Sequence, residues 1–233
     1  MEFGTFMSQG APGVEIKAGG KHRPLAIAAA IEVALIFAGI LAYIWRWQHT
    51  HPFVWVGLWA FILLSHVVHH DTWRSLGLAG AEFRACARWV LPLAVLMFLP
   101  MLFYGFWRHH LEVIQPTWRS LIPLLGYGSW CAFQQYLTQS YFHNRLMLVI
   151  PNRHVSSVLI GIMFSATHIP NVILMVATFV AGTVFAEVFA LHRNIWPLAL
   201  AQAVGGLLLA AVSPDALIHH MRVGPSYLFF GIR

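Results

Sequence analysis

The apolar residues of this chain are gathered into long blocks, separated by short polar stretches. Hydrophobic residues make up 59% of its 233 residues and charged residues only 9%, whereas soluble domains have about 45–50% apolar and about 25% charged residues. A soluble fold with so few charges would lack the polar side chains that cover a surface in water. We therefore expect an all-α fold, a polytopic bundle of transmembrane helices that satisfy their backbone hydrogen bonds within the bilayer.

Seven apolar segments are candidates for membrane-spanning helices. A helix needs about 20 apolar residues to cross the hydrocarbon core, and Pro151 and Pro170 mark boundaries between consecutive segments. The predicted spans are residues 24–47, 52–68, 87–107, 118–150, 155–169, 172–191 and 195–212. The fifth of these is short, so it is either a short span or a re-entrant helix.

The sequence predicts one transmembrane domain, residues 23–233, preceded by a flexible tail, residues 1–22. The tail is polar and Gly-rich, and a second methionine, Met7, follows residues 1–6, which resemble a cloning remnant. No small-residue cleavage site follows the first apolar run, so we expect that run to remain as a membrane anchor.

The distribution of positive charge favours a cytoplasmic N-terminus. If all seven segments cross, nine of the fourteen Lys and Arg residues lie inside: Lys17, Lys21, Arg23, Arg74, Arg84, Arg88, Arg145, Arg153 and Arg193. The other five lie outside: Arg46, Arg108, Arg119, Arg222 and Arg233. We expect an integral protein of a bacterial inner membrane, in contact with membrane lipids. The positive charges are scattered singly, so no nucleic-acid partner is expected.

Amide and imidazole side chains lie deep inside three of the predicted spans, where polar groups are costly and usually functional. The fourth segment carries Gln134, Gln135 and Gln139, the fifth carries His168 near its end, and the seventh carries Gln202. At a rise of about 1.5 Å per residue, Gln134 lies roughly 21 Å from the start of its segment, His168 roughly 20 Å and Gln202 roughly 10 Å. They are therefore predicted to meet in one intramembrane polar pocket. The alternative is that they only join helices by hydrogen bonds.

Three further residues are candidates for substrate binding. Tyr141 follows Gln134 by seven residues, so the two share a helix face two turns apart. Phe164 precedes His168 by four residues, and Asn171 follows the proline that separates the fifth segment from the sixth.

Three motifs in the C-terminal half have a familiar order and spacing. They are Gln134-Gln135-x-x-x-Gln139, Phe164-x-x-x-His168 and Gln202-x-x-x-Gly206. These motifs resemble the CPBP superfamily, which contains the CAAX prenyl endopeptidases and the bacteriocin-processing membrane proteases. That family carries Glu-Glu-x-x-x-Arg, Phe-x-x-x-His and His-x-x-x-Asn on successive helices. Residues 193–197 also resemble the loop that precedes the family's third motif. The resemblance implies a CAAX-protease-like fold for this half of the chain.

The resemblance also implies an intramembrane hydrolase that acts on a membrane-embedded peptide or lipidated substrate. In the family a glutamate activates water, and a histidine holds the water or the oxyanion. Glutamine keeps the hydrogen bonds of glutamate but cannot accept a proton, and general-base catalysis needs a titratable group. Of the aligned positions, only His168 can titrate. The chain is thus interpreted as a divergent hydrolase-like protein, or as a non-catalytic scaffold that binds a helix or lipid in the same groove.

A third hypothesis rests on histidines. His66, His69 and His70 are three and four residues apart, so they share one helical face, a spacing that can hold a divalent metal. This would suit a His-dependent membrane metalloenzyme of lipid modification. The alternative is that these imidazoles are solvated at a helix end.

Two acidic residues lie inside predicted spans, Glu32 in the first and Glu187 in the sixth. Glu187 belongs to the family-like half and is therefore a candidate for the missing carboxylate, although its place near the inner end also suits a solvated side chain.

Overall fold

The computed structural model describes residues 22–109 and 118–229, and every regular element in these ranges is helical. The predicted all-α class is confirmed. The elements are α1 (His22–Ala42), η1 (Tyr43–Trp47), α2 (Gln48–Thr50), α3 (Val54–Val68), η2 (Gly80–Glu82), α4 (Phe83–Trp107), α5 (Trp118–Gln135), η3 (Tyr136–His143), α6 (Asn144–Val149), α7 (Arg153–Ala166), α8 (Val172–Leu191), α9 (Trp196–Val212), α10 (Asp215–Ile218), η4 (His219–Met221) and α11 (Pro225–Leu228).

Three of these helical stretches are long and apolar enough to cross a membrane: Pro24–Thr50, Gly80–Trp107 and Val172–Leu191. Their length and composition are those of a membrane protein. Three shorter apolar helices, Val54–Val68, Arg153–Ala166 and Trp196–Val212, accompany them. The described chain therefore has fewer helices of full spanning length than the seven spans predicted from the sequence.

The helix boundaries follow local capping chemistry. Asn152 accepts a hydrogen bond from the Val155 backbone N–H (3.1 Å) at the start of α7, and Asn171 does the same for α8. Asparagine is a preferred N-cap because its side-chain oxygen satisfies a backbone N–H that has no helical acceptor. The boundaries predicted at Pro151 and Pro170 are confirmed, since each proline lies between two helices.

The fourth predicted segment forms one continuous helical rod in which α5, η3 and α6 follow one another without a break. Its middle part, η3, is π-helical, with hydrogen bonds from residue i to i+5. The glutamine-rich motif spans the junction of α5 and η3. Short π-helical stretches often occur at functional sites, so the local backbone marks this region as unusual.

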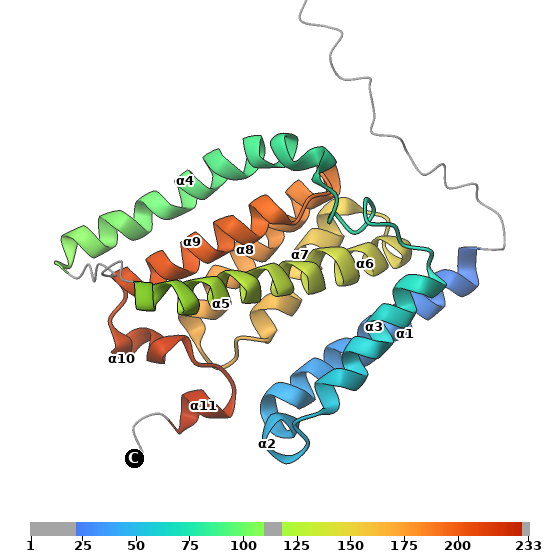
Figure 1. Cartoon of the computed structure of the whole chain (residues 1–233), viewed down its shortest axis with the longest axis horizontal. Coiled ribbons are helices and arrows are strands. Elements are labelled where there is room, and N and C mark those ends of the chain that lie inside the picture. The colour runs from blue at the N-terminus through green and yellow to red at the C-terminus, as the bar shows by residue number, and fades with distance from the viewer. Residues whose placement is uncertain (1–21, 110–117, 230–233) are drawn as a thin grey trace, which may run out of the picture.

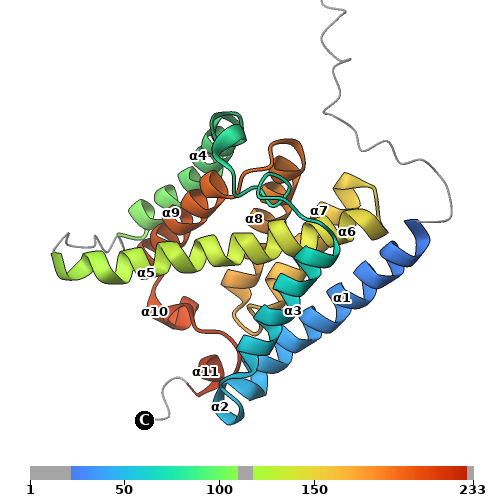
Figure 2. The same ribbon diagram turned by 45° about the vertical axis from the view of Figure 1, so that its right-hand side comes forward.

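The helices form a bundle with a separate hairpin at one side (Figures 1 and 2). Helices α4, α5 and α9 pack together, and α7 pairs with α8. Helices α1 and α3 lie side by side; α1 packs against α6, and α3 contacts the rod through Trp59 and His66 at Phe133 and Tyr136.

Loops gather at the two opposite ends of α8. At its C-terminal end, Asn144 Nδ2 and Arg193 Nη1 each donate to the backbone oxygen of Ser75, at 3.0 Å. At its N-terminal end, the Gly224 N–H donates to the backbone oxygen of Ile169, at 2.8 Å. Segments distant in sequence are thus tied together at both ends of the bundle.

Candidate functional site

Four glutamines form a continuous chain of hydrogen bonds between the rod and α9. Gln139 Nε2 donates to Gln135 Oε1 (3.3 Å), and Gln135 Nε2 donates to Gln202 Oε1 (2.6 Å). Gln202 Nε2 then donates to Gln134 Oε1 (2.5 Å). The structure therefore brings together the four glutamines that the sequence singled out, which lie on two different helices.

This amide chain has a buried end and an open end. Gln135 and Gln139 are fully buried, and Gln139 Oε1 has no hydrogen-bond partner among the described residues. Gln134 and Gln202 are only partly buried and line a large cavity. Gln135 and Gln139 thus hold the amide chain in place from within the protein, and only Gln134 and Gln202 are placed to contact a ligand.

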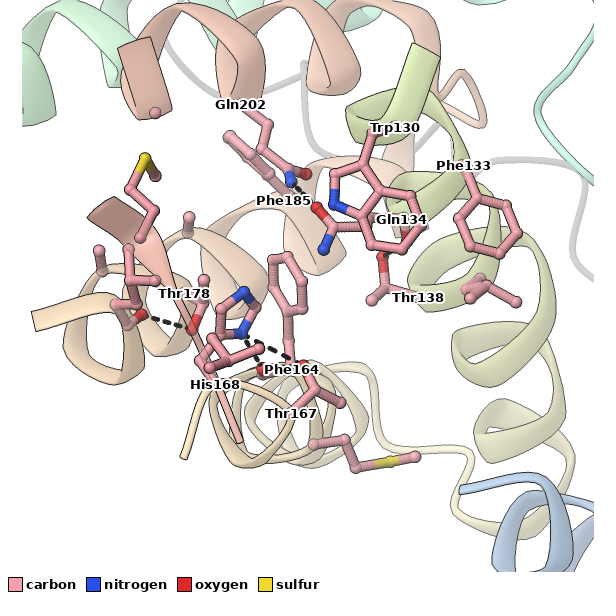
Figure 3. Close-up of a pocket in the computed structure, with 18 of the residues that line it drawn as sticks. Trp130, Phe133, Gln134, Thr138, Phe164, Thr167, His168, Thr178, Phe185 and Gln202 are labelled. Carbon is pink, nitrogen blue, oxygen red and sulfur yellow. Dashed lines mark hydrogen bonds between the residues drawn. The ribbon is translucent and has the colours of Figure 1, made fainter. Parts of the chain in front are cut away.

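The cavity has a volume of about 1340 Å³ and lies between the α1–α3 hairpin and the bundle. Its walls are mainly apolar and aromatic, with Trp59 from α3, Phe98 from α4, Trp130 from α5 and Phe185 from α8 among them. Its polar side chains include the Gln134–Gln202 amide pair, three threonines and His168 (Figure 3). Among the described residues that line it, none carries a carboxylate or a fixed positive charge.

His168 lies at the C-terminal end of α7, where its ring is held in one orientation. Nδ1 lies 2.8 Å from the Phe164 backbone oxygen and 3.2 Å from Thr167 Oγ1. A carbonyl oxygen only accepts, so Nδ1 carries the proton and Nε2 has the lone pair in the neutral ring. The Phe164 ring meets the imidazole edge-on, with centroids 5.1 Å apart. Figure 3 shows the other ring nitrogen pointing into the cavity.

The three candidates for substrate binding have different surroundings. Phe164 lines the cavity beside His168. Tyr141 is fully buried away from it, with its ring against Phe142 and under the Arg145 guanidinium. Asn171 is also fully buried: besides capping α8, it donates to the backbone oxygens of Ile218 (2.8 Å) and Arg222 (3.1 Å). Of the three, only Phe164 is therefore placed to contact a ligand in this cavity.

The three histidines proposed as metal ligands are engaged separately. His66 Nδ1 lies 2.7 Å from Asp71 Oδ2, and its Nε2 lies 2.8 Å from the Tyr136 hydroxyl. His69 Nε2 lies 3.1 Å from Glu32 Oε1, whereas His70 is exposed. Within residues 22–109 and 118–229, no group of three or more His, Cys, Asp or Glu side chains is placed to hold a metal. Helical spacing alone was therefore misleading, because both nitrogens of His66 already have partners.

Those partners belong to a buried charge cluster that sequence reasoning missed. Arg145, whose side chain is 1% exposed, lies at its centre. Its Nη2 donates to Asp71 Oδ2 (2.7 Å) and its Nε to Glu32 Oε2 (3.2 Å), while Ser65 Oγ donates to the same Glu32 oxygen (2.6 Å). The signal was present in the sequence, since Glu32 and Arg145 are opposite charges inside two predicted spans. The cluster fastens the α1–α3 hairpin to the rod.

The Asp71 carboxyl lies in the loop after α3, where two influences on its pKa oppose each other. Burial favours the neutral form and so raises the pKa, but hydrogen bonds from His66 and Arg145, together with the Arg145 charge, favour the carboxylate. The bonds and charges dominate and hold the pKa of Asp71 below its usual value.

Glu187 does not supply a carboxylate to the cavity. It pairs with Arg153 Nε (3.0 Å) and His154 Nδ1 (2.9 Å) at the partly exposed end of α8. The cavity therefore relies on amides, hydroxyls and one imidazole for its polar chemistry.

No protein-family model, curated protein or solved structure matches this chain.

Proposed function

We propose that this chain is a membrane-embedded binding protein whose cavity holds a lipid or lipidated peptide from the bilayer. The observation that carries this proposal is the cavity of about 1340 Å³, which has mainly apolar and aromatic walls and a minority of polar side chains. Ligand pockets are typically apolar with a few placed polar groups. A hydrocarbon chain suits the walls, and a polar head suits the Gln134–Gln202 amides.

The proposed topology has seven crossings with a cytoplasmic N-terminus in a bacterial inner membrane. Its support is that the loops 69–79 and 192–195, both assigned to the inner side, are joined through Ser75 and Arg193. The segments around Ile169 and Gly224, both assigned to the outer side, are joined as well. Short helices can span where the bilayer thins locally or the helix ends carry interfacial anchors.

We extend the proposal to a scaffold of the CAAX-protease-like kind. The support is that positions from all three resembling motifs converge: Gln134 and Gln135 bond Gln202, and His168 lines the same cavity as Gln134. Two of these glutamines, Gln134 and Gln202, line that cavity, which glutamines that only join helices need not do.

Binding without hydrolysis is favoured because no carboxylate that could act as a general base is among the described residues that line the cavity. Glutamine cannot act as a general base. The carboxylates of Glu32 and Asp71 are engaged by Arg145, and that of Glu187 by Arg153. None of these acids is among the described residues that line the cavity.

A second candidate function, a divergent hydrolase, is favoured by one observation. His168 carries an unprotonated Nε2 that faces the cavity, while Nδ1 is fixed by the Phe164 carbonyl. An imidazole held in this way is suited to accept a proton from water or a substrate.

One experiment tests both candidates. The full chain is reconstituted in phosphatidylcholine nanodiscs and titrated with a fluorescent farnesylated peptide, and the probe is then analysed for cleavage by mass spectrometry. We expect saturable binding of the intact probe that weakens in Gln202→Leu and is retained in Leu200→Ala, a lipid-facing change on the same helix. Cleavage that disappears in His168→Ala would favour the hydrolase. Absence of saturable binding would refute the binding proposal.

A further inference from the structure

The amide chain in the site has a direction. Each glutamine donates its Nε2 proton to the oxygen of the next, in the order Gln139, Gln135, Gln202 and Gln134. The Gln134 oxygen accepts the last of these bonds, so the Gln134 NH₂ group is the donor end of the whole chain. This NH₂ group donates to no acceptor among the described residues, and Gln134 lines the cavity.

The free donor at the end of this chain determines which group a ligand must place beside Gln134. Linked hydrogen bonds polarise one another in a low-dielectric interior, so the terminal N–H is a better donor than an isolated amide. A donor that is desolvated without an acceptor costs free energy. A ligand that fills this part of the cavity must therefore bring an acceptor to Gln134.

The second requirement comes from His168, which has the opposite character. Its Nδ1–H is directed to the Phe164 carbonyl, so its Nε2 offers a lone pair to the cavity. His168 and Gln134 line the same cavity (Figure 3). The ligand head must therefore bring a donor as well as an acceptor.

We infer that the cavity selects a long-chain secondary amide, as in the head of an N-acyl lipid, whose carbonyl accepts from Gln134 and whose N–H donates to His168. This inference rests on the proposed function, because it assumes that the cavity binds a molecule from the bilayer. An ester of the same length offers only acceptors and leaves His168 without a donor. A carboxylate head would be desolvated with no fixed positive charge among the described lining residues.

The test compares three single-chain molecules with the same dodecyl chain: N-dodecylacetamide, dodecyl acetate and dodecanol. Each displaces the fluorescent farnesylated peptide from the full chain in phosphatidylcholine nanodiscs. We expect the amide to displace the probe at a concentration about tenfold lower than the ester, since one buried hydrogen bond separates them. The alcohol should displace the probe about as weakly as the ester. Its single oxygen carries both its donor and its acceptor, so it cannot reach Gln134 and His168 at once as the separate C=O and N–H of the amide can.

Two variants assign the selectivity to the named residues. His168→Phe removes the acceptor, so the amide and the ester should become equivalent. Gln134→Met removes the donor that the amide and ester share, so both should weaken together and the preference for the amide should remain. Leu200→Ala, on the lipid-facing side of α9, serves as the control and should retain the wild-type order.

The outcomes separate this inference from the proposal beneath it. Equal displacement by amide and ester in the wild-type protein, or displacement by the alcohol as strong as by the amide, would overturn the amide assignment while leaving lipid binding intact. Failure of the fluorescent peptide itself to bind would overturn both. The wild-type comparison decides the matter even where a variant does not fold.

Discussion

Gln135 Nε2 lies 2.6 Å from Gln202 Oε1, and this bond joins two residues that are 67 positions apart in the chain. The Gln135 side chain is fully buried, so this contact replaces its hydration. Because Gln202 also donates to Gln134, one side chain on α9 holds two consecutive residues of the rod. The amide cluster is thus a structural link between helices, and two of its members, Gln134 and Gln202, also line the cavity.

Replacement of this link should destabilise the fold. Gln202→Leu leaves Gln135 Nε2 and Gln134 Oε1 without their partners, and an unpaired buried polar group costs about 1–3 kcal/mol. We expect thermal unfolding in detergent at a lower temperature than the wild-type protein. Leu200→Ala, which is 64% exposed on the same helix, should change the melting temperature little. Equal melting of Gln202→Leu and wild type would show that the amide chain contributes no stability.

Removal of the charge at the centre of the buried cluster should have a larger effect. Arg145→Met leaves the Glu32 and Asp71 carboxylates without their cation, and breaking a buried ion pair costs about 3–5 kcal/mol. Arg153→Met provides a matched control, because Arg153 is 38% exposed in its pair with Glu187 and such pairs contribute about 0–1 kcal/mol. Unfolding in denaturant measures both variants. Similar losses in the two would contradict the central role of Arg145.

The same cluster predicts how stability depends on pH. The pKa of Asp71 is lower in the folded protein than in the unfolded chain, so its carboxylate stabilises the fold above its ordinary pKa. That contribution is lost as the pH falls through the lower folded pKa. We expect Asp71 to leave the melting temperature unchanged from about pH 7 to about pH 5 and to lower it below about pH 4, where this carboxyl becomes protonated in the unfolded chain. Asp71→Asn should melt lower at neutral pH and show a shallower drop, and an unchanged slope would exclude Asp71 as a source.

Close packing of α7 against α8 depends on a glycine. A Cβ atom at Gly161 would lie 2.7 Å from the Phe179 backbone oxygen and would also clash with Thr183 Oγ1. Gly161→Ala should therefore destabilise the protein by about 1–3 kcal/mol through overpacking. Gly57→Ala has open space around it and should be neutral or stabilising by up to about 1 kcal/mol, since alanine favours helices. Melting curves of the two variants in the same detergent compare them directly.

The proposed orientation can be tested by labelling. In a background with Cys86→Ala and Cys131→Ala, single cysteines are introduced at Phe53 and Trp73, which are 78% and 74% exposed. With a cytoplasmic N-terminus, a membrane-impermeant maleimide added to intact bacterial cells should modify the cysteine at 53 and spare the one at 73. Both should react after the cells are lysed. The reverse pattern would refute the orientation.

The elements that sequence reasoning predicted well are those fixed by local chemistry. The helix ends near Pro151 and Pro170 follow from proline and asparagine capping, and the convergence of Gln134, Gln139 and Gln202 follows from helix depth and the cost of buried amides. Each of the seven predicted segments is helical in the described chain, but three helical stretches have full spanning length, because several of the apolar runs are themselves shorter than about 20 residues.

The charge cluster could not be deduced from helical spacing. The partners of His66 could not be read from that spacing because each comes from outside its helix: Asp71 from the next loop and Tyr136 from the rod. The role of Asn171 was hidden for the same reason, since its acceptors at Ile218 and Arg222 lie far along the chain.

The π-helical stretch η3 sets the angular position of everything that follows it on the rod. Gln135 lies before this stretch and faces α9, whereas Arg145 lies beyond it and faces the hairpin. Deleting one residue inside η3 would convert the wide turn to an ordinary α-turn and rotate α6 by about 100° relative to α5. Gln134 and Gln135, which precede η3, would keep their bonds to Gln202, while Arg145 would turn away from Glu32 and Asp71. The π-helical stretch therefore sets the rotation of the second half of the rod relative to the first. It lets one continuous helix contact α9 on one side and the hairpin on another.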